Sequence, residues 1–452
     1  MLITNANLIT WEEPNRILNK HALYMEDGKI VNFGPMDDLI NAYPDVERID
    51  AADQYVLPGN ICAHTHFYGA FARGLVTPGQ SPKDFTDILQ KLWWPLDKSL
   101  TLEAISLSTQ VMLVDAIKNG TTTLIDHHAS PNAIDGSLDV IAEVVEQGGL
   151  RVGLCYEVSD RDGPVKSKAG IEENIRFIKA HSRASPAPNN SRIAASFGLH
   201  ASLTLSDETL DACREAVPDD VGFHIHVAEH EVDQYDSLAK TGLRVVDRLY
   251  HHKILGPHTI AAHAVHVDAR EIDLLAESGT WVTHQPRSNM NNGVGVAQVE
   301  SMLRAGVRVG LGTDGFSHTM WAEWKCAYLL HKAWHRDPRR MPGLDVIRMG
   351  VYQNAALANS LFPLTPMGVI QPGMAADLIF VDYHPFTPFT PENLPWHILF
   401  GFQEGMITTT LVDGKILMRN RKLLTLDEDA ICARAQECAA RVWEQYRRNF
   451  YA

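Results

Sequence analysis

The chain has 452 residues, with 40 Lys and Arg against 55 Asp and Glu, so its net charge is −15 with histidine neutral. A protein that binds nucleic acid through its phosphates needs a basic face, so this acidic excess argues against a nucleic-acid partner. With 45% hydrophobic and 21% charged residues the composition excludes a disordered chain and predicts a globular protein with a large core.

The sequence favours the cytoplasm. Its first residues contain no basic segment followed by a long apolar one, and no run of about 18 apolar residues occurs anywhere. We therefore expect neither a signal peptide nor contact with a membrane. The six cysteines are dispersed and form no C-x-x-C pair, which argues against a zinc ribbon and against a disulfide framework.

Both ends of the chain are predicted to form short strands. Near the N-terminus they are expected over residues 2–10, 22–33 and 46–57, and near the C-terminus over 377–382, 408–412 and 415–418. The dipeptides Asp27-Gly28 and Asp413-Gly414 interrupt these runs as hairpin turns do, because both residue types tolerate positive φ. The repeated pattern predicts one small β-sandwich domain built from residues 1–57 and 366–420.

The middle of the chain has a different pattern. Eight short apolar segments each end in His, Glu or Asp, over residues 57–66, 121–127, 150–157, 192–200, 221–229, 259–263, 280–284 and 307–314. Intervening segments such as 102–118 and 171–180 have the apolar spacing of a helix that covers a sheet. Eight alternating strands and helices predict an α/β fold, a (β/α)₈ barrel of the TIM type, over 58–365. A C-terminal helix is expected within 421–452.

Candidate metal ligands lie at the predicted strand ends, where such barrels place their chemistry. These residues are His64, His66, His200, His226, Glu229, His263 and Asp314. In a strand, side chains two residues apart face the same side, so His64 and His66 can converge on one ion. A single His-x-His occurs by chance, and a lone histidine is usually structural. The coincidence of so many imidazoles and carboxylates at one mouth predicts a site for a divalent ion such as Zn²⁺ or Fe²⁺.

Several motifs in combination resemble the amidohydrolase superfamily, in particular its aminohydrolase branch of triazine hydrolases and purine-type deaminases. They are Pro-Gly-Asn-Ile-Cys-Ala-His-Thr-His at 58–66, His-Val-Ala-Glu at 226–229, Ala-His-Ala-Val-His at 262–266, Leu-Gly-Thr-Asp-Gly at 311–315 and the glycine-containing segment 368–378. The resemblance covers residues 1 to about 420. Segments 92–97 and 126–131 are most similar to the aminohydrolases called SsnA.

The resemblance implies roles for the residues at the strand ends. His64, His66, His226 and Asp314 would hold one divalent ion, most simply Zn²⁺ with Fe²⁺ as the alternative. A bound metal lowers the pKa of its water from 15.7 towards about 7, so hydroxide would attack the substrate at neutral pH. Asp314 can take a proton from the water, His263 would orient water or substrate, and Glu229 would protonate a ring nitrogen and then the departing amine.

The predicted fourth strand argues for a single ion. Superfamily members with two metals use a carbamylated lysine at the end of this strand, and residues 196–202 contain no lysine. The absence favours the deaminases over the cyclic-amide hydrolases.

Candidate substrate contacts are Trp93, His128, Glu157, His200 and His284. Most have an alternative role. Trp93 fits a buried core position, and His128 and His200 could instead cap or support their strands. His284 could shape the pocket rather than bond the substrate, and Glu157, at the end of its strand, could bind an exocyclic amine.

The sequence as a whole predicts a metal-dependent hydrolytic deaminase acting on a small N-heteroaromatic or cyclic amidine substrate of purine, pterin or triazine type. We expect it to form a homo-oligomer, a dimer or larger. Two alternatives stay open. One is a hydrolase of the same family with another leaving group, a chlorohydrolase or cyclic amidohydrolase, and the other is a catalytically silent barrel with a role in assembly.

Overall fold

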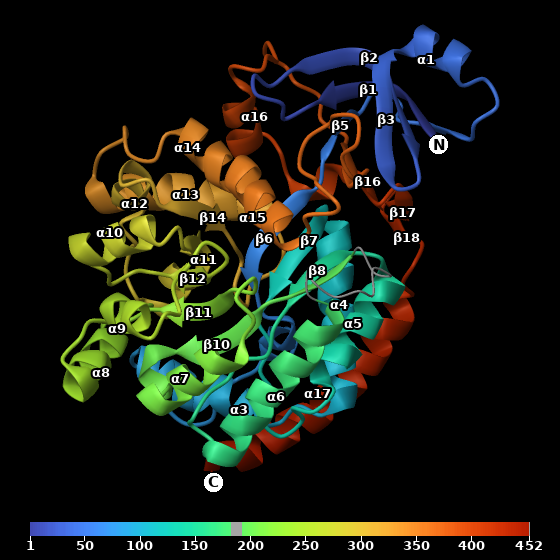
Figure 1. The fold of residues 1–452 in the computed structure, drawn as a ribbon. Coiled ribbons are helices and arrows are strands. Elements are labelled where there is room, and N and C mark those ends of the chain that lie inside the picture. Colours follow the sequence, from blue (N-terminus) through green and yellow to red (C-terminus); the bar gives the residue numbers. More distant parts are fainter. Residues whose placement is uncertain (182–191, 452) are drawn as a thin grey trace.

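A computed structural model describes residues 1–181 and 192–451. Its main part is a barrel of parallel strands surrounded by helices (Figure 1). The first strands of the chain and those of residues 378–423 form a separate β domain beside the barrel, whereas the C-terminus itself lies far from that domain. This arrangement confirms the predicted fold class. We propose 58–365 for the barrel and 1–57 with 366–420 for the β domain, although residues 394–400 pack on helices of the barrel and residues 422–423 add a last strand to the sheet.

Every one of the eight expected barrel segments contains a strand. The strands are β6 (Asn60–Thr65), β7 (Thr121–Asp126), β8 (Arg151–Leu154), β9 (Ile193–Ala195), β10 (Phe197–Ala201), β11 (Phe223–Val227), β12 (Ile260–His263), β13 (Trp281–His284) and β14 (Arg308–Leu311). The fourth segment is divided at Ser196, because β9 pairs with β8 and β10 pairs with β11. All these pairings are parallel, as strands connected through helices require.

Backbone hydrogen bonds join the last barrel strand to the first. The amides of Thr313 and Asp314 donate to the carbonyl of His64 at 2.9 and 3.1 Å. Gly312 makes this approach feasible, because a Cβ at that position would lie 2.7 Å from the backbone of His64. The contact places Asp314 directly beside His64 in β6 and close to His66, which follows that strand.

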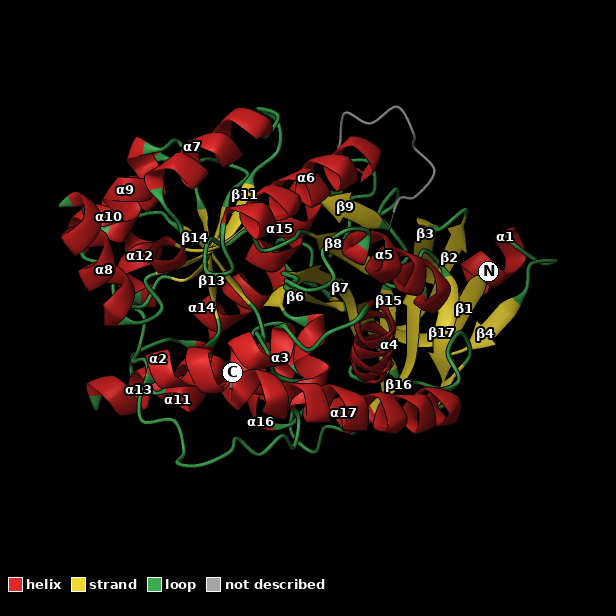
Figure 2. Ribbon diagram, turned by 90° about the horizontal axis from the view of Figure 1, so that it is seen from below, coloured by secondary structure: helices red, strands yellow, loops and turns green. Residues whose placement is uncertain are grey.

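Helices cover the outside of the barrel (Figure 2). They are α4 (Leu102–Lys118), α5 (Ser137–Gly148), α6 (Pro164–His181), α7 (Asp207–Ala216), α8 (Glu231–Thr241), α9 (Val245–His251), α10 (Ala269–Glu277), α11 (Pro286–Asn292), α12 (Val299–Arg304), α13 (Met320–His335), α14 (Gly343–Ile347), α15 (Asn354–Leu361) and α16 (Leu394–Phe400). Polar caps begin several of them; Thr101 accepts the amide of Ala104 at the start of α4, and Asp268 forms a capping box with Glu271 in α10.

The β domain is one mixed sheet. Its strands are β1 (Leu2–Ile9), β2 (Ile17–Glu26), β3 (Lys29–Pro35), β4 (Arg48–Asp50), β5 (Tyr55–Pro58), β15 (Leu378–Val381), β16 (Ile407–Val412), β17 (Lys415–Arg419) and β18 (Lys422–Leu423), with the short helix α1 (Met36–Ala42) after β3. The N-terminal and C-terminal strands meet where β5 pairs antiparallel with β15. Segments from both ends of the chain therefore build one β domain, as predicted, but its strands are hydrogen-bonded into a single sheet and not into the two sheets of the expected sandwich.

The two predicted Asp-Gly turns lie against each other. All four residues have positive φ, between 48° and 78°. A Cβ on Gly28 would lie 3.2 Å from the Cβ of Asp413, so the turns touch. Arg151, at the start of β8, bonds Asp413 at 2.5 Å and Asp377 at 3.1 Å. These ion pairs between Arg151 of the barrel and Asp377 and Asp413 of the β domain connect the two parts of the structure.

One irregular segment follows the first barrel strand. It contains η1 (Phe67–Ala72), α2 (Phe85–Ile88), the π-helical turn η2 (Leu89–Trp93) and α3 (Trp94–Asp97). The long C-terminal helix α17 (Glu428–Tyr451), which overlaps the predicted one, runs along α3 and α4 (Figure 1). Among the described residues no single helix is long and apolar enough to cross a membrane, and one pair bent by 111°, Phe85–Asp97 with Leu102–Lys118, passes by length and composition alone.

Candidate metal centre and active site

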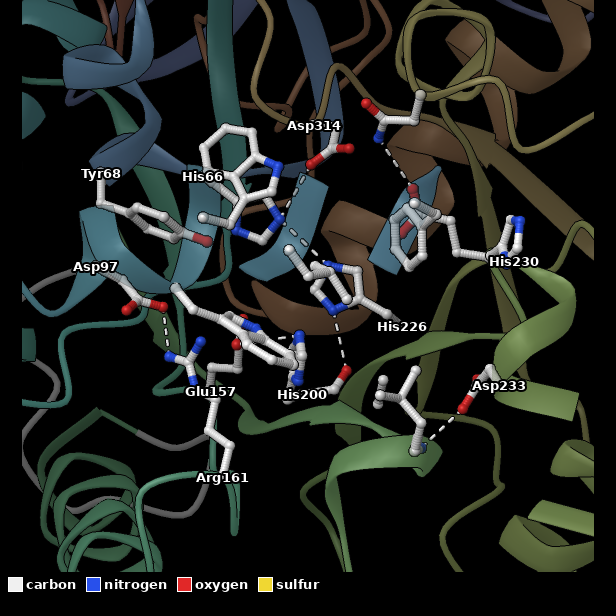
Figure 3. Close-up of a pocket in the computed structure, with 18 residues that line it drawn as sticks. His66, Tyr68, Asp97, Glu157, Arg161, His200, His226, His230, Asp233 and Asp314 are labelled. Atoms are coloured by element: carbon white, nitrogen blue, oxygen red, sulfur yellow. Dashed lines mark hydrogen bonds and ion pairs between the residues drawn. The ribbon is translucent and has the colours of Figure 1, made fainter. Parts of the chain in front are cut away.

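The four expected metal ligands meet at one end of the barrel, where Figure 3 shows His66, His226 and Asp314. His64 belongs to β6 and His66 directly follows that strand, His226 belongs to β11, and Asp314 follows β14. Nε2 of His66 lies 3.1 Å from Asp314 Oδ1 and 3.2 Å from Nε2 of His226. Nε2 of His64 lies 3.8 Å from the same carboxylate oxygen. The sequence spacing and the order of the strands thus bring these four side chains together.

The second ring nitrogen of each of two histidines is held by the backbone. Nδ1 of His66 donates to the carbonyl of His127 at 2.5 Å, and Nδ1 of His226 donates to the carbonyl of His200 at 2.9 Å. Outer hydrogen bonds of this kind fix the orientation of an imidazole and leave Nε2 available to a metal.

His64 provides the clearest test of whether a metal fits. Its Nδ1 pairs with Nε2 of His224 at 2.8 Å, whereas its own Nε2 is buried and has no hydrogen-bond partner among the described residues. Burial, with the neighbouring histidines, holds the pKa of His64 well below its usual range, so the ring is a neutral ligand. A buried, unpartnered nitrogen beside two imidazoles and a carboxylate fits a divalent ion.

Two further predicted residues face this cluster. His263 has a φ of 72°, an uncommon value for a non-glycine residue, and its Nδ1 donates to Asn289 Oδ1 at 2.8 Å. Its Nε2 lies 3.6 Å from Glu229 Oε2 and 3.8 Å from Asp314 Oδ2. The other oxygen of Glu229 accepts a hydrogen bond from Asn292 at 3.1 Å.

Glu229 is suited to hold a proton. Burial raises the pKa of its carboxyl group; His263 opposes this shift and the charge of Asp314 adds to it. Such a carboxyl group keeps its proton closer to neutral pH than an ordinary glutamate does, which is the property that a general acid needs.

The proposed metal ligands lie at the wall of a cavity (Figure 3). Part of its wall is aromatic, formed by Tyr68, Phe85, Trp93 and Trp94. Of the expected substrate contacts, Trp93, Glu157 and His200 line the cavity. Glu157 Oε1 lies 3.6 Å from Nε2 of His200. The cavity therefore combines flat apolar faces with a few converging polar groups, as small-molecule sites do.

His128 and His284 do not line this cavity, although both were expected to contact substrate. His128 is buried and its Nε2 pairs with Oγ of Ser130 at 2.9 Å. His284 is buried with its Nε2 3.4 Å from Nε2 of His331, on the barrel side of α13. Packing against neighbouring elements holds both rings away from the cavity.

A buried ion pair in the cavity wall was not predicted. Arg161, in the loop after β8, donates to the carboxylate of Asp97, which ends α3. Asp97 Oδ1 and Arg161 Nη1 are buried and lack hydrogen-bond partners among the described residues, so both retain capacity for a ligand. The two residues lie 64 positions apart in irregular segments, and no sequence pattern connects them.

His224 was not among the predicted residues, although the sequence contains a signal for it. Residues 224–226 read His-Ile-His, the same spacing as His64 and His66, and this spacing predicts that His224 faces the barrel interior beside His226. The short helix α11 was also overlooked. It supplies Asn289 and Asn292, together with Ser288, whose hydroxyl donates to Asp314 Oδ2 at 2.5 Å.

Comparison with known proteins agrees with this geometry. A model described as the amidohydrolase family matches residues 55–417. A 5'-deoxyadenosine deaminase of Methanosarcina mazei is 32% identical over 97% of both chains, and a 5-methylthioadenosine/S-adenosylhomocysteine deaminase of Pelotomaculum thermopropionicum is 30% identical over 98% of both. The crystal structure of an adenosine deaminase from Xanthomonas campestris with bound zinc superposes with a TM-score of 0.83 at 23% identity, over 98% of each chain. The expected hydrolase class is confirmed, and the chain belongs to the amidohydrolase family.

Proposed function

We propose that this chain is a metal-dependent hydrolytic deaminase whose substrate is an adenosine-type nucleoside modified at its 5' position. The observation that carries the proposal is the convergence of three imidazoles and Asp314 on one point, beside the buried carboxyl group of Glu229. The full-length relatives supply the substrate class, since they are named for 5'-deoxyadenosine and for 5-methylthioadenosine and S-adenosylhomocysteine.

His64, His66, His226 and Asp314 would hold one divalent ion. We propose Zn²⁺, with Fe²⁺ as the alternative, because neutral imidazoles and one carboxylate suit both. Bound there, the ion would lower the pKa of water and supply a nucleophile at neutral pH. The cavity lining contains no lysine, which agrees with a single ion.

The protein's own groups would then move two protons. Asp314 Oδ2 would accept a proton from the attacking water, and Nε2 of His263 would orient that water or the substrate. Glu229 would give its proton to ring nitrogen N1 as the C6–O bond forms. It would then take the proton of the new C6 hydroxyl and pass it to the exocyclic amine as the C6–N bond breaks, and the proton held by Asp314 would finally restore Glu229. In the overall balance the two protons of water thus appear on N1 and on ammonia, and the products are a hypoxanthine nucleoside and ammonia.

The rest of the cavity fits a nucleoside. Trp93 and Trp94 offer flat faces for the purine. We propose that Glu157 and His200 contact the base, and that Asp97 and Arg161 bind the sugar hydroxyls through the atoms that lack protein partners.

Ammonia release from a panel of compounds tests the proposal. We expect turnover with 5'-deoxyadenosine, 5-methylthioadenosine or S-adenosylhomocysteine, seen as conversion of the adenine to the hypoxanthine spectrum. Turnover of pterins or triazines alone would overturn the substrate class. A metal-loaded protein that releases neither ammonia nor chloride from any compound would support the silent barrel.

We also propose that copies of the chain associate in the cytoplasm. Four large apolar side chains are exposed on helices α13, α14 and α16, which contact one another: Trp334, Leu344, Trp396 and Phe400. Exposed apolar clusters of this kind are typical of protein interfaces. Light scattering after size exclusion should show a dimer or larger, and the double variant Trp334→Ser with Phe400→Ser should shift the oligomer towards the monomer.

The free cysteines agree with a reducing compartment, which supports the proposed location in the cytoplasm.

A further inference from the structure

The C-terminal helix α17 is hydrogen-bonded to the irregular segment that forms the aromatic wall of the cavity. Trp443, Tyr446 and Asn449 are spaced three residues apart, so they share one face of the helix. Each donates a hydrogen bond to a backbone carbonyl of that segment; the acceptors are Phe71 at 2.8 Å, Lys91 at 2.5 Å and Pro95 at 3.2 Å, in that order.

The hydrogen bond from Tyr446 reaches a carbonyl whose usual helical donor is absent. In an α-helix the carbonyl of Lys91 would accept the amide of the residue four positions later. That residue is Pro95, which has no N–H. The chain is already irregular here, since the π-helical turn η2 runs directly into α3. The hydroxyl of Tyr446 gives this carbonyl a donor that Pro95 cannot supply.

Tyr446 is well suited to this role. Its side chain is fully buried, so no water competes for the carbonyl of Lys91. Burial also raises the pKa of Tyr446 to about 12, and the hydroxyl therefore keeps the proton that it donates.

The segment that α17 contacts carries aromatic side chains that line the cavity. Trp93 packs edge-on against Tyr68, with ring centroids 6.0 Å apart. On its other side Trp93 approaches Gly315 so closely that a Cβ there would lie 3.1 Å from the indole ring. Gly315 directly follows Asp314, a proposed metal ligand. A shift of η2 would therefore change the distance between the aromatic wall and the metal centre.

We propose that Tyr446 is a positioning residue for substrate binding. Through the carbonyl of Lys91 it holds η2 and α3 in place, and so fixes Trp93, Trp94 and Asp97 relative to the metal ligands. The nature of the bound ligand rests on the proposed function, whereas the mechanical role of α17 does not.

Tyr446→Phe is the decisive variant, because it removes the hydroxyl and keeps the ring that packs in the core. We expect amide hydrogen exchange over residues 85–97 to become about fivefold faster, which is the loss of one ordinary hydrogen bond. The KM for 5'-deoxyadenosine should rise by a similar factor, while kcat and metal content change by less than about twofold.

Restoring the missing amide provides a second test. Pro95→Ala gives the backbone an N–H four residues after Lys91. In the Tyr446→Phe background this change should return both the exchange rate and the KM towards the wild-type values. Arg448→Ala is the matched control on the same helix, since Arg448 is exposed and pairs only within α17, with Glu444, among the described residues. It should leave both quantities unchanged.

Three outcomes would overturn the proposal: unchanged exchange over 85–97, exchange that rises equally in the barrel strands, or a failure of Pro95→Ala to compensate. If the wild-type protein has no activity on adenosine-type nucleosides, the proposed function fails, and the exchange measurements still decide the role of Tyr446.

Discussion

Nδ1 of His64 and Nε2 of His224 lie 2.8 Å apart inside the barrel, although one belongs to β6 and the other to β11. Burial lowers the pKa of both rings well below the usual range, so both are neutral and they share a single proton in their contact. The pair therefore fixes which nitrogen of His64 is free to face Asp314. A partner of this kind tunes a metal ligand without touching the metal.

His224→Ala should lower the affinity for the metal by about 10–100-fold, the usual cost of losing a partner that orients a ligand. Competition with a chelator of known affinity measures the change. His224→Gln should recover part of the loss, because the amide can still accept a hydrogen bond from His64. An unchanged affinity in His224→Ala would show that His64 needs no such support.

Metal content should be about one ion per chain. His226→Ala removes a proposed ligand and should lose most of the bound metal together with activity. Trp93→Ala is the control within the same cavity, and it should keep the metal while it weakens substrate binding. Elemental analysis of the three purified proteins gives the answer, and two ions per wild-type chain would contradict the single-ion site.

The barrel could be predicted because its strands are buried on both faces and read as continuous apolar runs that end in His, Glu or Asp. The break at Ser196 could not, since it depends on which neighbour each half of the strand pairs with. The group of candidate metal ligands was predictable for a related reason. Parallel strands bring their carboxyl ends to one mouth, so His66, His226 and Asp314 could be expected to meet before any contact was known.

The residues that line the cavity were harder to predict, because a position at a strand end does not decide whether the side chain reaches the cavity. Trp93, Glu157 and His200 line the cavity, whereas His128, which sits at an equally suitable strand end, packs away from it. Asp97 lies in a segment whose path depends on a proline, a π-helical turn and a helix more than 300 residues later. No local pattern contains that information.

Asp160 supports the loop that carries Arg161. Burial raises the pKa of its carboxyl group, but hydrogen bonds from Ser167, Ser206 and Thr209 outweigh this effect and lower the pKa below its ordinary value. Asp160→Asn should reduce the free energy of unfolding by roughly 1.5 kcal/mol at pH 7, the lower end for bonds to a charged group because the residue is half-buried.

The loss in free energy of unfolding caused by Asp160→Asn should depend on pH. A carboxyl group with a lowered pKa stabilises the fold fully above its unfolded pKa of about 3.9, and this contribution is lost as the pH falls through the folded pKa. Urea unfolding at pH 7, 5 and 3 should therefore give the same difference between variant and wild type at the first two values and a smaller one at the third. A difference independent of pH would show that the negative charge contributes nothing.

Glu229→Gln tests the proposed proton transfer. The variant keeps the size of the side chain and can still contact Asn292, but it loses the carboxyl group that titrates. General acid–base catalysis is typically worth about 10²–10⁴-fold, so kcat for an adenosine-type substrate should fall by that factor with metal content unchanged. Near wild-type turnover would mean that Glu229 carries no proton in the reaction.

The same variant separates the two leaving groups. Chloride departs without a proton, whereas an amine must be protonated before the C–N bond breaks. On a chloro-substituted purine nucleoside, Glu229→Gln should therefore lose less activity than on the amino-substituted one, with both measured by formation of the same hypoxanthine product. An equal loss on the two substrates would place the action of Glu229 at the ring nitrogen, which gains a proton, or at the water, which loses one, because both transfers are required whichever group departs. In that case the buried carboxyl group would still serve catalysis, but its presence would give no reason to prefer ammonia over chloride as the natural leaving group.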